Sequence, residues 1–165
     1  MRRALFAFRS LRWPILLLVG IGSASPALAD KVRITKLSDV NFGTVGSLQT
    51  DARQSQSVCV YSNGQTATYS VAASGSGPGS AFTLSNGPYL LSYDLEWSSL
   101  AGQTSGNALA PNVALSGQTS AATNQQCSSG PSASASLTLV LRGTNLSAAR
   151  EGAYSGSLTL IIGAE

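Results

Sequence analysis

Hydrophobic and polar residues alternate with a period of two over many short runs of this chain. Successive side chains of a β-strand point to opposite faces, so this alternation predicts half-buried strands and not helices. The clearest runs are residues 32–35, 58–61, 69–71, 90–97, 137–142 and 158–162. We therefore expect a protein built mainly from β-strands.

Clusters of Gly, Pro, Ser and Asn separate these runs and favour turns. They recur at short intervals, as in a β-sandwich or barrel. Residues 58–73, with a turn at 62–65, predict a hairpin. Residues 100–126 are rich in small polar side chains and predict a long loop with one short strand, and residues 148–151 predict a single helical turn.

The run 90–97 divides clearly into two faces. The apolar face, which we expect in the core, consists of Leu91, Tyr93, Leu95 and Trp97. The polar face, which we expect in solvent, consists of Ser92, Asp94 and Glu96. Glycoside hydrolysis uses a pair of carboxylates, but no other residue type of such a site accompanies this pair. We interpret Asp94 and Glu96 as the solvated side of the strand.

The first 29 residues have the three parts of a secretory signal. Several arginines come first, an apolar run over 14–22 follows, and Ala27-Leu28-Ala29 precedes Asp30. The apolar run is about half of the ~20 residues that a membrane-spanning helix needs. We therefore expect residues 1–29 to be cleaved as a signal peptide and residues 30–165 to be exported as one β-sandwich domain.

The charge and composition of the chain exclude several classes of function. Four of its ten basic residues lie in the leader, which leaves six against seven acidic residues, close to neutral. Such a balance, without basic clusters, argues against nucleic-acid binding. The absence of His removes Ser-His-Asp and Cys-His catalysis and imidazole zinc sites. We expect no enzyme, and no catalytic residue, metal, cofactor or small-molecule substrate.

The chain has two cysteines, Cys59 and Cys127, both beyond the leader. An oxidising compartment makes a disulfide between them the expected state, and two buried free thiols are the alternative. The disulfide would close a loop of about 69 residues, and the chain-entropy model then gives roughly 4 kcal/mol of stability.

An apolar strand is expected almost at the end of the chain. Leu158, Leu160 and Ile162 alternate there with Thr159 and Ile161, and little sequence follows that could pair with the far side of the strand. An exposed apolar edge of this kind is a site for strand addition from another chain. The alternatives are an ordinary edge strand, or pairing with the chain's own strand at 32–35.

Four segments and a cysteine-bearing strand form a series along the chain. They are DVNFGTV at 39–45, the strand that carries Cys59, TYSV at 68–71, LSYDL at 91–95 and GAYSGSLTL at 152–160. The N-F-G and G-x-Y-x-G-x-L-T-L elements are the most specific of them. This series resembles the spore coat protein U domain, which is found in secreted subunits of archaic chaperone-usher pili.

The resemblance implies an all-β, incomplete immunoglobulin-like sandwich of the pilin type, which lacks its final strand. A periplasmic chaperone lends that strand, and in the fibre the N-terminal extension of the next subunit replaces it. The residues that would border the vacant groove are Tyr154, Leu158, Leu160 and Ile162. Val32 and Ile34 would form the donor strand or pair within their own domain. The sequence therefore leaves open whether the protein is a shaft, tip, minor or self-complemented subunit.

The expected function is that of a structural pilus subunit that supports surface attachment and biofilm formation. Its expected partners are a periplasmic chaperone, an outer-membrane usher and other pilus subunits, and it would pass through the periplasm to the cell surface or pilus. The alternative is a self-contained secreted binding module, for carbohydrate as one example, with Tyr89, Tyr93 and Trp97 as stacking residues. The alternation places Trp97 in the core, which weighs against that alternative.

Overall fold

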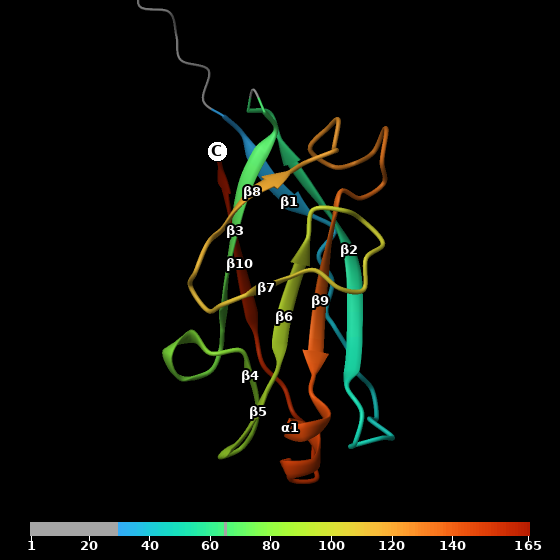
Figure 1. Cartoon of the computed structure of the whole chain (residues 1–165), viewed down its shortest axis with the longest axis vertical. Helices are drawn as coiled ribbons and strands as arrows, with labels where there is room; N and C mark the ends of the chain where they lie inside the picture. Colours follow the sequence, from blue (N-terminus) through green and yellow to red (C-terminus); the bar gives the residue numbers. More distant parts are fainter. Residues whose placement is uncertain (1–29, 65) are drawn as a thin grey trace, which may run out of the picture.

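The computed structural model describes residues 30–64 and 66–165, so the expected signal peptide lies outside the described residues. Figure 1 shows an elongated molecule whose strands run mostly along its long axis. The strands are β1 (Val32–Thr35), β2 (Ala52–Ser62), β3 (Thr68–Gly75), β4 (Thr83–Asn86), β5 (Tyr89–Ser92), β6 (Asp94–Ser98), β7 (Asn107–Leu109), β8 (Leu115–Thr119), β9 (Ala135–Leu141) and β10 (Leu158–Ala164). The described helical elements are a 3-10 turn (Pro78–Ser80) and α1 (Gly143–Ala148).

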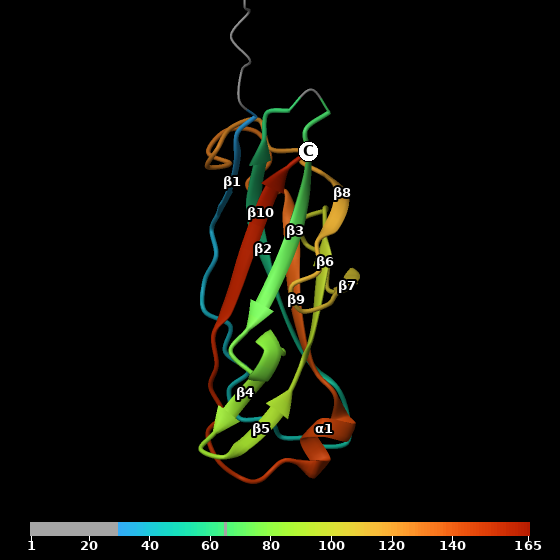
Figure 2. The ribbon, with the colours of Figure 1, turned by 90° about the vertical axis from the view of Figure 1, so that its left-hand side faces the viewer.

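Two antiparallel sheets pack against each other as a sandwich. One has five strands in the order β1-β2-β9-β6-β7, and the other has three in the order β10-β3-β8. Figure 2 shows the three-stranded sheet in front of the larger one, with the β4–β5 ribbon and α1 at the lower end. The prediction of an all-β sandwich is confirmed.

The core lies between the two sheets, where the alternating residues of each sheet meet. Its largest fully buried side chains are Trp97, Tyr69, Leu95, Leu137, Val58, Val60 and Val71. Trp97 of β6 contacts Tyr69 of β3 edge to face, with ring centroids 6.4 Å apart. The face that alternation assigned to the core in run 90–97 is therefore buried as expected.

The predicted hairpin over 58–73 is wrong, because β2 and β3 belong to different sheets. The apolar residues of both strands, such as Val58 and Tyr69, face the space between the sheets. The turn after β2 therefore carries the chain across the sandwich, where a hairpin would have kept both strands in one layer. Alternation identified the strands correctly but did not reveal their partners.

Three further elements differ from the sequence predictions. The run 90–97 is divided at Tyr93, because β5 pairs with β4 whereas β6 pairs with β9. The region 100–126 holds two short strands, β7 and β8, where one was expected. The helix begins at Gly143, earlier than the predicted turn, since the Gly143 N–H donates to Asp51 Oδ1 at 3.0 Å.

The expected disulfide is present between Cys59 of β2 and Cys127, whose Cα atoms lie 5.9 Å apart. It ties the loop that precedes β9 to the larger sheet. Lys36 adds a second attachment, because its Nζ donates to the carbonyl oxygens of Cys127 at 3.2 Å and Ser132 at 2.6 Å. The loop between β8 and β9 is thus fixed near β1.

Candidate functional site

One side of the sandwich carries β1 at the edge of the larger sheet and β10 at the edge of the smaller one (Figure 2). Within the described chain, β1 has a single hydrogen-bonded neighbour, β2, and β10 has a single neighbour, β3. Some Cα atoms of β1 and β10 lie within 8 Å of each other, yet the two strands form no ladder. We call this side, made of β1, residues 36–45 and β10, the β1–β10 edge.

Four apolar side chains before and along β10 point toward the core. This inward row consists of Tyr154, Leu158, Leu160 and Ile162, all packed against the core and all half-buried. By contrast, every residue of the central strand β9 is buried. The inward row is therefore covered by the sandwich on one side only, and the structure brings together all four residues that the sequence predicted at this edge.

The opposite wall of the β1–β10 edge comes from the N-terminal part of the domain. Val32 and Ile34 of β1 are half-buried and lie opposite Ser62 and Val60 of β2 in the antiparallel register. In this structure β1 thus pairs within its own domain. To serve as a donor strand, it would have to leave β2.

Residues 36–45 also contribute to this wall, which the sequence analysis had not anticipated. Val40, Phe42 and Val45 are half-buried and pack against the core. The spacing of two between Val40 and Phe42 was the signal available for them. It is short and stands beside Gly43, so it did not predict a strand, and the structure has none there.

The hydroxyl of Tyr154 is a polar group within this apolar row. Its Oη is buried and has no hydrogen-bond partner among the described residues. The neighbouring Ser155 is fixed by two backbone hydrogen bonds with Ser85, at 2.7 and 3.0 Å. Hydrogen bonds thus fix the backbone next to Tyr154, whereas the Tyr154 hydroxyl has a donor that no described residue accepts.

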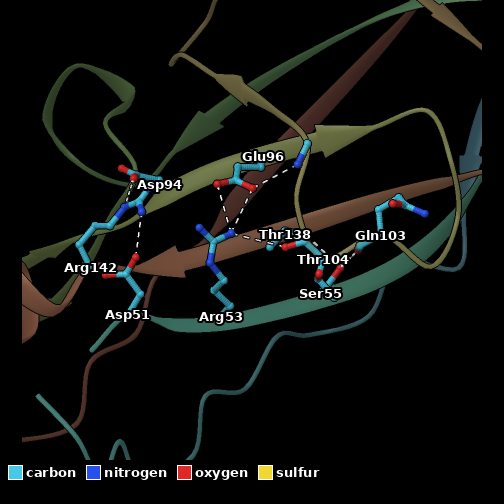
Figure 3. Close-up of polar contacts among 10 residues, drawn as sticks. Asp51, Arg53, Ser55, Asp94, Glu96, Gln103, Thr104, Thr138 and Arg142 are labelled. Atoms are coloured by element: carbon cyan, nitrogen blue, oxygen red, sulfur yellow. Dashed lines mark hydrogen bonds and ion pairs between the residues drawn. The ribbon is translucent and has the colours of Figure 1, made fainter. Parts of the chain in front are cut away.

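The two carboxylates of β6 lie on the outer face of the larger sheet, away from the β1–β10 edge (Figure 3). Asp94 accepts a hydrogen bond from Arg142 Nε at 2.6 Å, and Arg142 Nη1 also donates to Asp51 at 2.8 Å. The Gly143 N–H and Arg142 together lower the pKa of Asp51 below its ordinary value. Asp94 and Asp51 are thus both engaged in structural ion pairs with Arg142.

Glu96 is not on a solvated face, so that expectation is wrong. It is 9% exposed, and its carboxylate accepts hydrogen bonds from Arg53 at 3.3 Å and the Gly106 N–H at 3.2 Å. The loop between β6 and β7 covers it, held by bonds of Gln103 to Ser55 and Ser136. The local alternation of β6 could not show that a distant loop folds over its polar face.

The three aromatic residues proposed for carbohydrate stacking do not form one surface. Trp97 is fully buried, and Tyr93 is 5% exposed and stacked on Phe82 with centroids 5.7 Å apart. Tyr89 is exposed, but the Arg150 guanidinium already lies 5.3 Å from its ring centroid. The arrangement therefore gives no support to that alternative.

Residues 30–64 and 66–165 contain no cluster of three or more Cys, Asp or Glu side chains that is placed to hold a metal ion. No described helix is long and apolar enough to cross a membrane.

Comparison with known proteins supports the fold. No family model and no curated protein matches the sequence. A chain of the chaperone-tip adhesin complex of CFA/I fimbriae is similar in structure, with a TM-score of 0.53 and 18% identity over 82% of this chain and 41% of that one. A chain of the CsuC-CsuE chaperone-tip adhesion subunit complex, from the archaic chaperone-usher Csu pili of Acinetobacter baumannii, has a TM-score of 0.47 and 18% identity over 82% and 40%. This chain thus spans about two fifths of the length of the solved chains it matches, and the likeness shows a shared fold.

Proposed function

We propose that this protein is an exported structural subunit of a pilus, and that a β-strand of another polypeptide completes it at the β1–β10 edge. Donor-strand exchange through a periplasmic chaperone and an outer-membrane usher would assemble it with other pilus subunits. The assembled fibre would support attachment to surfaces and biofilm formation. The secretory pattern of residues 1–29 agrees with this route.

The observation that carries the proposal is the half-buried inward row on an unpaired edge. Leu158, Leu160 and Ile162 are only half-buried, and no described strand pairs with the free side of β10. An added strand would bury this surface, at about 25 cal/mol per Å² of apolar area, and would pair the free backbone groups of β10. Strand addition would therefore stabilise this edge in two ways, by burying apolar side chains and by pairing backbone groups.

Two further observations support the proposal. The segments at 39–45 and 152–160, which resemble the spore coat protein U domain, lie in or directly before the β1–β10 edge. The structural similarity to a chain of a chaperone-tip adhesin complex concerns a fold used in such assemblies.

The experiment is expression of the full gene in a bacterial periplasm, with and without a pilus chaperone from the same genome. Without the chaperone we expect degradation, aggregation or polymers that dissociate only on heating. With the chaperone we expect a soluble complex of one chain of each. A stable monomer that does not bind the chaperone would contradict the proposal.

Two adjacent substitutions make this test specific for the edge. Leu160→Asp places a charge in the inward row, whereas Thr159→Asp places the same charge on the exposed outer face of β10. We expect the first to abolish the chaperone complex and the second to retain most of it. Equal loss in both would mean that the edge is merely sensitive to charge.

A further inference from the structure

The outer face of β10 carries one large apolar side chain, Ile161, which is 63% exposed. It is the central residue of the strand, and it points away from the inward row formed by its neighbours Leu160 and Ile162. Ile161 therefore contributes little to the core of this domain. A threonine or serine would satisfy the alternation at this position equally well.

The neighbours of Ile161 on the smaller sheet do not cover it. Its partner on β3 is Ala72, and the flanking residues of β3 on the same face are Ser70 and Ser74. Gly163 adds no side chain to this face, and a Cβ there would lie 2.8 Å from Ser70 Oγ. On the β3 side, then, Ile161 meets only small side chains, and on the other side β10 has no neighbour.

Proteins usually protect an edge strand with charges, proline or a bulge. β10 contains no charged residue and no proline, and its register with β3 is continuous from Leu158 to Ala164. Instead, the centre of the edge is apolar on both faces. A strand laid beside β10 would place side chains next to Ile161 as well as next to the inward row.

We propose that Ile161 selects the incoming strand, which is apolar on its outer face opposite Ile161 in addition to its inward positions. This inference rests on the proposed function, since it specifies the occupant of the same edge. The partner is then a strand with a continuous apolar stretch at its centre. A strictly alternating strand with polar outer residues would bind less well.

The test is a competition between synthetic peptides during refolding of the protein purified after export. The first peptide has valine at every inward position and threonine at every outward one. Each of the others replaces one outward threonine by valine, which has nearly the same shape. Peptides of about nine residues are long enough to follow β10 at roughly 3.3 Å per residue. Mass spectrometry of the complexes gives the ratio bound.

We expect valine at one outward position to be preferred by about 1.5- to 5-fold, the range for a favourable cross-strand pair. In Ile161→Thr this preference should disappear, while binding of the first peptide persists. Leu100→Thr is the matched control, because Leu100 is also 63% exposed but lies on the loop after β6. That variant should keep the preference.

The outcomes separate the two proposals. If no peptide binds, the proposed strand acceptance itself fails. If all peptides bind equally to the unaltered protein, or if Ile161→Thr keeps the preference, strand acceptance stands and the role of Ile161 is refuted.

Discussion

The Trp97 indole N–H donates a hydrogen bond to the Tyr69 hydroxyl at 3.2 Å in the centre of the core. Trp97 belongs to β6 of the larger sheet and Tyr69 to β3 of the smaller one, so this bond joins the two layers of the sandwich. Both side chains are fully buried, and burial raises the pKa of Tyr69 to about 12. The bond thus links the two sheets whose edge strands, β1 and β10, form the β1–β10 edge.

Tyr69→Phe should destabilise the fold by about 1–3 kcal/mol, because it leaves the buried Trp97 N–H without an acceptor. Urea denaturation of the exported protein would measure the change. Tyr93→Phe is the control, since Tyr93 is also buried but its hydroxyl forms no hydrogen bond within the described residues. Equal losses in the two variants would mean that the inter-sheet bond adds nothing specific.

Removal of the disulfide should cost about 4 kcal/mol, the value of the chain-entropy model for a loop of this length. Cys59→Ala combined with Cys127→Ala leaves no free thiol, and both positions are buried, so alanine adds no polar group. We expect a lower urea midpoint that dithiothreitol does not change further. An unchanged midpoint would show that the hydrogen bonds of Lys36 and the surrounding loop contacts hold the loop in place without the disulfide.

The two arginines of the outer face should differ in importance. Arg53→Met would leave the carboxylate of Glu96 covered and without its cation, at a cost of about 1–3 kcal/mol. Arg142→Met affects Asp51 and Asp94, which are more exposed than Glu96, so we expect a smaller loss than for Arg53→Met. Thermal unfolding would rank the two, and Glu96→Gln should partly rescue Arg53→Met but not Arg142→Met.

The strands were predictable because alternation reports which residues of a local run face the core. Leu91, Tyr93, Leu95 and Trp97 were placed on the correct face without knowledge of their neighbours. Sheet membership depends on contacts between distant segments, so the same pattern could not tell a hairpin from the crossing between β2 and β3.

The candidate site likewise combines features that the local sequence predicts with features that depend on distant segments. The inward row was predictable from the alternation of Leu158, Leu160 and Ile162, and Tyr154 came from the family resemblance. The burial of Glu96 and the exposure of Ile161 were not predictable, because each depends on whether another segment covers that position. A loop covers Glu96, and within the described residues no strand covers Ile161.

Asp51 should make stability depend on pH in the acid range. Its folded pKa lies below the ordinary value of 3.8, so it contributes stability above about that pH, and the contribution is lost as pH falls through the folded value. Asp51→Asn should therefore be less stable at neutral pH but should lose less stability below pH 3.8. Urea midpoints across the acid range would test this, and parallel curves for both proteins would contradict it.

Tyr154→Phe should leave the unbound domain equally stable or make it more stable by about 1 kcal/mol, because it removes a buried hydroxyl that has no partner among the described residues. Packing of the ring in the inward row would be unchanged, so chaperone capture through apolar contacts should persist. Tyr154→Ala is the matched comparison, since it removes the ring and should weaken both folding and capture. Chemical denaturation together with co-purification of the chaperone would measure the two effects. A clear loss of stability in Tyr154→Phe would mean that the hydroxyl is bonded in solution and that the phenol, like Tyr69, holds the sandwich together.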